Sequence, residues 1–167
     1  MIDLLKKISR EDKNQIYFEN IDFNEIKKYP EKFFNLEKIG DSIYFYKSKA
    51  FKILNLTIDP EIFIRMENIS EKNFFVSFIK ININQFELQK SSIDLTINFE
   101  VFPKEEGIML KRCVKISVRE KLKIWFLPLL INDFLIDKVL KLICDRLDRK
   151  LKKMINKNID ISKTNIS

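Results

Sequence analysis

The stretch LLINDFLIDKVLKLICDRLDRKLKKMIN, residues 129–156, decides the fold expected for this chain. Apolar residues recur in it every three or four positions, the spacing that places them on one face of an α-helix. Such a helix would be about 40 Å long at 1.5 Å per residue. Its apolar stripe comprises Ile136, Leu140, Ile143, Leu147, Leu151 and Met154, and a charged face comprises Asp133, Asp137, Lys141, Asp145, Arg149 and Lys153. We expect a sheet that curls around this helix, because so long an apolar stripe needs a cover.

Between Leu36 and Ile124 the apolar residues recur every second position, which is typical of strands with one buried and one wet face. The polar segments IGDS, NISEKN, LQKSS and PKEEG interrupt this pattern where hairpin turns belong. One apolar phase comprises Leu54, Leu56, Ile58, Ile62, Ile64 and Met66, and another Ile93, Leu95, Ile97, Phe99 and Val101. The pattern predicts about six antiparallel strands.

The N-terminal part of the chain predicts short elements. Residues 1–12 are weakly amphipathic and are expected to form a short helix, and NQIYFEN, residues 14–20, is rich in strand formers. Asp22 and Glu25 have capping-box spacing at the start of a helix, which Pro30 then breaks or restarts. The expected fold class is therefore α+β: a first strand, two short helices, a curved antiparallel sheet of about six to seven strands in all, and a long C-terminal helix.

Length and composition favour one globular domain. The chain has 167 residues, of which 46% are apolar and 33% charged, so we expect a single domain over residues 1–157 and a disordered tail over 158–167. The longest clean apolar run, IWFLPLLI at residues 124–131, is too short to span a bilayer. We expect a cytoplasmic protein, or one in an equivalent compartment, with Cys113 and Cys144 reduced.

The residue counts exclude several kinds of chemistry. The chain has no histidine, which removes serine–histidine and cysteine–histidine nucleophile pairs and most zinc sites. Its two glycines, Gly40 and Gly107, are too few for a phosphate-binding loop or a dinucleotide fingerprint. We therefore expect no catalytic residue, no metal and no cofactor. Tyr44 and Tyr46 are expected to pack in the sheet rather than to act as acid or base.

The order of these elements resembles the START/SRPBCC helix-grip superfamily. More narrowly, VKISVREKLKIWFLPLLINDFLIDKVLKLICDRLDRKL and NLTIDPEIFIRMEN are similar to an uncharacterised family of cyanobacteria and plastids. The likeness covers roughly residues 33–151 and rests on apolar patterns rather than on catalytic signatures. It implies a cavity between sheet and helix that holds a lipid or another apolar molecule, and it adds the plastid stroma as a compartment. Its candidate lining is Leu95, Ile97, Phe99, Arg112, Val114, Ile116, Ile136, Leu140 and Ile143.

Arg112 and Glu120 fall in the apolar phase of the last long strand. A buried charge needs a partner. Either a bulge shifts the phase, which we favour, or Arg112 is a polar anchor at the end of the pocket and would bind a ligand carboxylate or phosphate.

Positive charge concentrates late in the chain. Residues 111–157 contain 14 basic and 5 acidic residues, so this segment has a net charge of +9 against +7 for the whole chain. Lys111, Lys115, Arg119, Lys121 and Lys123 share the outward phase of the last strand, and Arg146, Arg149, Lys150, Lys152, Lys153 and Lys157 crowd the end of the helix. This charge is either an ordinary solvated surface or a contact surface for an anionic membrane or an acidic protein. Nucleic acid is not expected, because no RNA-binding aromatic motif accompanies the charge.

The apolar run at residues 124–131 surrounds Pro128, which suits the first turn of the helix. Trp125 and Phe126 either plug the open end of the sheet or touch a lipid surface beside Lys115, Arg119, Lys121 and Lys123. The resulting hypothesis is a carrier that binds an apolar molecule without catalysis. The alternatives are a scaffold whose interior is filled by its own side chains and which meets an acidic partner, and a histidine-free cyclase or isomerase.

Overall fold

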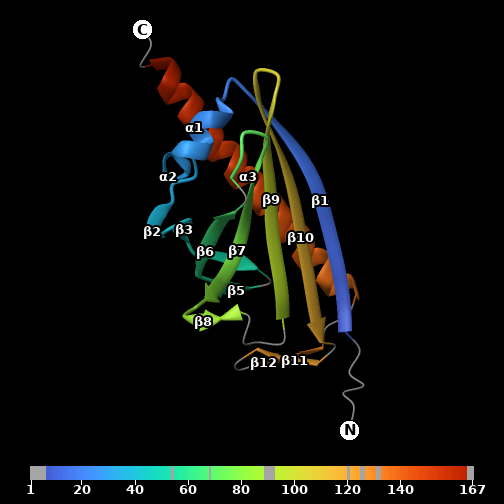
Figure 1. Ribbon diagram of the computed structural model, residues 1–167. Coiled ribbons are helices and arrows are strands. Elements are labelled where there is room, and N and C mark those ends of the chain that lie inside the picture. The colour runs from blue at the N-terminus through green and yellow to red at the C-terminus, as the bar shows by residue number, and fades with distance from the viewer. Residues whose placement is uncertain are drawn as a thin grey trace.

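The computed structural model describes residues 7–53, 55–67, 69–88, 93–119, 121–124, 127–130 and 133–164. It is an α+β structure in which one large antiparallel sheet packs on a long C-terminal helix (Figure 1). The expected fold class is confirmed. No helix within the described part of the chain combines the length and the apolar content needed to cross a bilayer.

The main sheet contains eight strands among the described residues, in the order β1-β10-β9-β7-β6-β3-β2, with β8 paired to β7. Its strands are β1 Lys7–Glu19, β2 Glu37–Gly40, β3 Ile43–Lys47, β6 Pro60–Glu67, β7 Phe74–Ile83, β8 Phe86–Glu87, β9 Ile93–Lys104 and β10 Gly107–Arg119. The first strand of the chain thus pairs with the last long one, and β1 forms one edge of the main sheet.

Two small hairpins lie outside this sheet. The β4 strand Phe51–Ile53 pairs with β5 Leu56–Ile58, and β11 Lys121–Ile124 pairs with β12 Leu127–Leu130. The β4–β5 hairpin connects β3 to β6, which are neighbours in the main sheet. It therefore extends the connection between two adjacent strands of the main sheet.

The short helices form where the sequence predicts them. The Asp22 side chain accepts a hydrogen bond from the Asn24 backbone N–H at 2.8 Å and caps α1, Phe23–Lys28. The next helix, α2, spans Pro30–Phe33 and begins at a proline. Proline suits this position because the backbone N–H groups of a first helical turn make no hydrogen bond within the helix, so its missing N–H costs nothing.

Three predicted boundaries are wrong. Residues 7–12 belong to β1 and not to a helix, because they pair with residues 114–119 of β10. Residues 1–6 of the predicted helix lie outside the described residues. The long helix α3 spans Asp133–Thr164 and not 129–156, so it continues past the predicted domain end at 157 and through most of the predicted tail. Pro128 lies in β12, where β11 pairs with it at Lys123, and not in a first helical turn.

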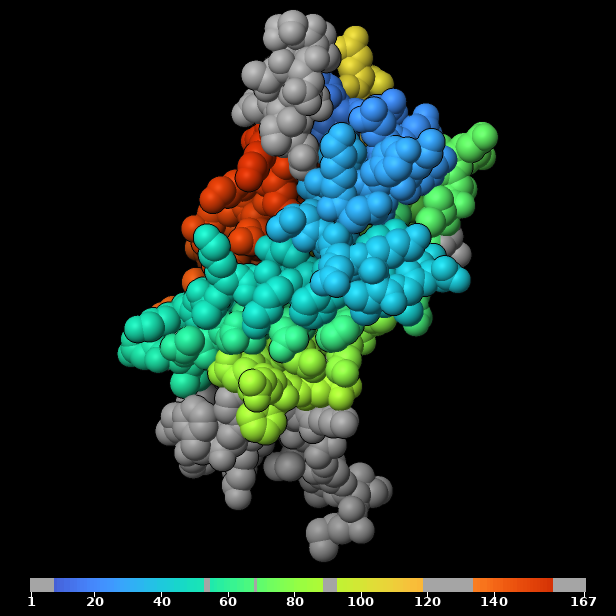
Figure 2. Space-filling view, turned by 90° about the vertical axis from the view of Figure 1, so that its left-hand side faces the viewer, coloured from blue at the N-terminus to red at the C-terminus, as the bar shows by residue number. Residues whose placement is uncertain are grey.

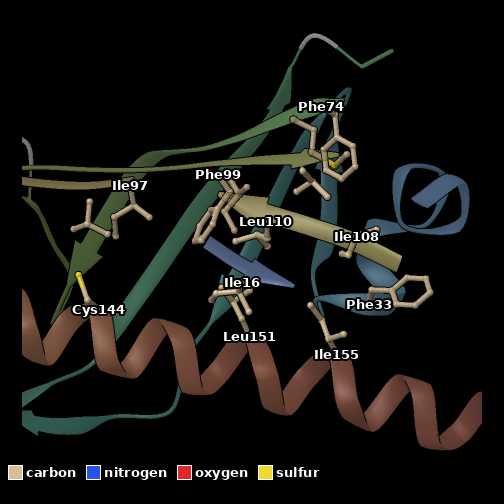
Figure 3. Close-up of a cluster of buried hydrophobic side chains, with 14 of the residues drawn as sticks. Ile16, Phe33, Phe74, Ile97, Phe99, Ile108, Leu110, Cys144, Leu151 and Ile155 are labelled. Carbon is tan, nitrogen blue, oxygen red and sulfur yellow. The ribbon is translucent and has the colours of Figure 1, made fainter. Parts of the chain in front are cut away.

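The core lies between the inner face of the sheet and α3. Phe74, Val101, Ile108, Leu110, Val114 and Ile155 are almost fully buried there. Figure 3 shows Cys144, Leu151 and Ile155 projecting from α3 toward Ile16, Ile97 and Leu110 on the strands. One apolar cluster thus joins β1, the middle strands and the helix, as the buried stripe on residues 136–155 requires.

Candidate functional site

The two flanks of α3 differ in chemistry. On the flank that faces β1, Asp137 pairs with Arg10 at 3.0 Å, and Asp148 accepts a hydrogen bond from the Asn14 side chain at 3.2 Å. Polar groups therefore attach this flank to the edge of the sheet.

Arg112 is the buried centre of the polar flank, with 3% of its surface exposed. Its Nε donates to Asp148 Oδ1 at 2.7 Å and its Nη2 to Asp148 Oδ2 at 3.1 Å, a bidentate pair. Nη2 also donates to Asp12 Oδ1 at 2.9 Å. Burial by itself would lower the pKa of Arg112, but the hydrogen bonds to Asp148 and Asp12 outweigh it, so the pKa is raised.

The favoured explanation of this position, a bulge, is wrong. β10 pairs with β1 and β9 residue by residue through Arg112 without a shift, so the side chain points inward as its phase requires. Its partners come from β1 and α3. A ligand carboxylate or phosphate would have to displace these two aspartates. Glu120 lies outside the described residues.

Cys144 adjoins this network. Arg112 Nη1 lies 3.2 Å from its sulfur. Burial raises the pKa of the Cys144 thiol to about 11, although the nearby guanidinium of Arg112 opposes the shift. The thiol is therefore protonated at neutral pH and poorly reactive.

The other flank of α3 is apolar in its first half. Leu135, Val139, Ile143 and Leu147 follow one another at four-residue steps, and each is only partly buried against the core. Arg146 lies on the same flank, with its guanidinium carbon 3.7 Å from the centre of the Phe51 ring in β4. Its Nη2 also lies 3.4 Å from Ser48 Oγ and from the Lys49 carbonyl. The β4–β5 hairpin is thus attached to the flank of α3 that lies away from β1.

The sheet contributes a matching set of partly exposed apolar side chains. Along β9, Ile97, Phe99 and Val101 are buried, whereas Ile93 and Leu95 in the same inward phase are only partly so. Further strands add members of this set: Tyr46, Ile62, Val76 and Phe78. The register pairs Tyr46 with Ile62, and Phe78 lies 5.9 Å from Phe99 between ring centres. Burial of the apolar face is therefore incomplete on both the sheet and the helix.

The predicted pocket residues fall into three groups. Ile97, Phe99, Val114, Ile116, Ile136 and Leu140 are buried in the core, Leu95 and Ile143 are partly buried, and Arg112 is ion-paired. The sequence analysis did not include Val139 and Phe78 among the pocket residues, although both belong to the partly exposed apolar set. Val139 follows Leu135 and precedes Ile143 by four residues, so a second helical stripe could have been found from spacing alone.

The predicted surface contacts are only partly described. Lys115 lies on the outer face and pairs with Glu11 at 3.6 Å, and Lys111 faces Glu100 across the ladder. Arg119 ends β10, and Lys121 and Lys123 lie in β11. Trp125 and Phe126 lie outside the described residues. Of the predicted basic stripe, Lys111 and Lys115 therefore have acidic neighbours.

An open hollow of about 730 Å³ lies elsewhere, where β1 leads into α1 beside the β9–β10 turn. Its lining is mainly polar and includes Asp22, Lys27, Glu71, Glu105 and Glu106, together with the apolar Ile21, Phe23 and Pro103. Within the described residues no group of three or more cysteine, aspartate or glutamate side chains could hold a metal ion.

A scan against family models finds no match, and no curated protein matches the chain. Among solved structures, the chain is similar to an uncharacterised protein from Rhizobium leguminosarum, with 7% identity, a TM-score of 0.46 and coverage of 91% of this chain and 99% of that one. It is also similar to the Mll3558 protein from Rhizobium loti, with 6% identity, a TM-score of 0.41 and coverage of 71% and 85%. A third structure, Ara h 8.0201, has the helix-grip fold and matches with 10% identity, a TM-score of 0.38 and coverage of 92% and 98%. The narrower likeness to a cyanobacterial and plastid family stays a prediction.

Proposed function

We propose that the protein binds an apolar small molecule or lipid between the sheet and the first half of α3, without transforming it. One observation carries this proposal: the inner face of the sheet and the facing flank of α3 both present apolar side chains that their own packing leaves partly exposed. Such surface is costly in water, at roughly 25 cal/mol for each Å². An apolar ligand would remove it from solvent.

The described side chains favour binding over catalysis. The pKa of Tyr44, which lies on the inner face, is raised by burial and by the nearby Glu31, so its phenol is a weaker acid than usual. The carboxylates nearest the interior, Asp12 and Asp148, are paired with Arg112. Neither arrangement prepares an acid or base for work at neutral pH.

The first test is extraction of the purified protein with organic solvent, followed by mass spectrometry. We expect an apolar molecule at close to one equivalent. If none is recovered and a fluorescent fatty-acid analogue fails to bind, the proposal is wrong and the scaffold hypothesis replaces it. A pull-down at low and at high salt would then show whether an acidic protein partner exists.

The second test locates the site. Val139→Trp places a large ring on the partly exposed flank of α3, and we expect it to weaken binding of the fluorescent analogue by about tenfold, equivalent to roughly 1.4 kcal/mol. Lys138→Trp is the matched control, because Lys138 is the preceding residue and is exposed. Circular dichroism melts establish that both variants fold. Equal binding by the two variants would show that the ligand does not bind at this flank.

A further inference from the structure

The second half of α3 carries a basic face. Arg146, Arg149, Lys150, Lys153 and Lys157 follow one another at intervals of three, one, three and four residues. At 100° per residue they fall within an arc of about 100° on the helix. We call these five residues the basic face.

The basic face lacks acidic partners. Among the carboxylates whose side chains the structure describes, none lies within ion-pairing distance of its five members. Asp137 and Asp148 of the same helix are instead paired with Arg10 and Arg112 on the opposite flank. Arg149 donates instead to the Asp145 backbone carbonyl at 3.3 Å. The positive charge of this face is therefore not balanced within the described fold.

The face is also accessible. Arg149, Lys153 and Lys157 are exposed, and Arg146 and Lys150 are partly buried. The second half of α3 runs past α2 toward the end of the molecule away from β8 and the β11–β12 hairpin (Figure 1). Figure 2 shows part of this half at the surface, beside α1 and α2.

We propose that the basic face docks the protein on an anionic membrane surface. Three of its five members are lysines, flexible cations that suit a surface of mobile lipid headgroups better than the bidentate geometry of one protein carboxylate. Single-stranded nucleic acid is less suited, since such sites combine cations with aromatic stacking platforms. The exposed aromatic residues among the described ones are Tyr17, Tyr29, Phe86 and Phe134, and none belongs to this face.

The basic face belongs to the cations that the sequence concentrates at the end of the helix. It is separate from the other contacts that the sequence suggested, on the last strand and at Trp125 and Phe126. It is also independent of the proposed ligand site: docking through α3 needs no occupied interior. The two proposals can therefore fail separately.

The test is cosedimentation, in low and in high salt, with vesicles of phosphatidylcholine alone and with vesicles of phosphatidylcholine mixed with phosphatidylserine. The wild-type protein is expected to bind only the anionic vesicles, and less at high salt. The triple variant Lys150→Glu, Lys153→Glu, Lys157→Glu is expected to bind on the order of 100-fold more weakly, since each cation near a membrane contributes about fivefold. Arg146 is left unchanged because it contacts Phe51.

The matched control is Lys38→Glu, Lys72→Glu, Lys104→Glu, which changes the net charge equally at exposed lysines on other elements. It is expected to keep most of the binding. Equal losses in the two triple variants would show that net charge and not the basic face matters, and would overturn the proposal. It would also be overturned if wild-type protein ignored anionic vesicles, or if a labelled single-stranded oligonucleotide bound more tightly than they did.

Discussion

Arg112 joins three elements through one guanidinium group. It lies in β10, and its carboxylate partners come from β1 and α3. Charged hydrogen bonds of this kind are strong when they are shielded from water, and losing one partner leaves the others unpaired.

We expect Arg112→Met to lower the free energy of unfolding by about 3 kcal/mol, because Asp12 and Asp148 would then repel each other without a counter-charge. Urea denaturation measures this change. Asp148→Asn is the matched variant: it leaves Arg112 with Asp12 and should cost less. A loss below about 0.5 kcal/mol in Arg112→Met would show that the network contributes little to stability.

Cys144 and Cys113 should differ in reactivity. The pKa of Cys144 is about 11, so at pH 8 its thiolate fraction is roughly two orders of magnitude below that of an ordinary thiol of pKa about 8.5. We expect one fast and one slow thiol in reaction with a chromogenic disulfide reagent, and the slow reaction should accelerate as the pH rises toward 11. Cys144→Ala should abolish the slow phase; its survival in that variant would contradict the assignment.

At the scale of elements, the pairing of β1 with β10 depends on a close approach of their two backbones at Gly107. A methyl group on Gly107 would overlap the Phe18 carbonyl oxygen of β1, whereas one on Gly40 would meet only Ile43 Cβ at 3.8 Å. Gly107 therefore sits where β1 and β10 begin their pairing, opposite Glu19.

We expect Gly107→Ala to destabilise the protein by about 2 kcal/mol, since backbone atoms cannot move aside as a flexible side chain can. Gly40→Ala should change stability by less than about 0.5 kcal/mol. Thermal and urea unfolding measure both variants. Similar stabilities would mean that β1 and β10 can separate locally at little cost.

Helix α3 shows why element type was predictable and element ends were not. Its apolar residues recur with the helical period, a local signal that needs no knowledge of the rest of the chain. Its buried residues are Ile136, Leu140, Cys144, Leu151 and Ile155. Three of them belong to the predicted stripe, whereas Cys144 and Ile155 are buried in place of their neighbours Ile143 and Met154. The start at Asp133 follows from pairing of Leu127–Leu130 with β11, which competes with helix formation.

At the scale of the whole molecule, an apolar ligand would couple the sheet to α3. A ligand that binds only the folded state stabilises it by about 2.7 kcal/mol at a free concentration 100 times its dissociation constant. We expect protein stripped by organic extraction and refolded to melt at a lower temperature than protein as purified. Adding back the extract should restore the melting temperature in wild type and less so in Val139→Trp. An unchanged melting temperature after stripping would argue against an occupied interior.

The sequence by itself determined the α+β class, the two short helices after the first strand, the alternating strands and the long terminal helix, because each is specified by periodicity and capping within a few neighbouring residues. Its alternation also put Arg112 in the inward phase of its strand, although a bulge was the favoured interpretation of that position. Only the tertiary structure decided that Asp12 and Asp148 neutralise this charge, that Val139 and Phe78 join the partly exposed apolar set, and that one face of α3 keeps its cations unpaired. These features depend on which distant segments meet: a carboxylate 100 residues away can balance a buried arginine, and no local pattern records that distance.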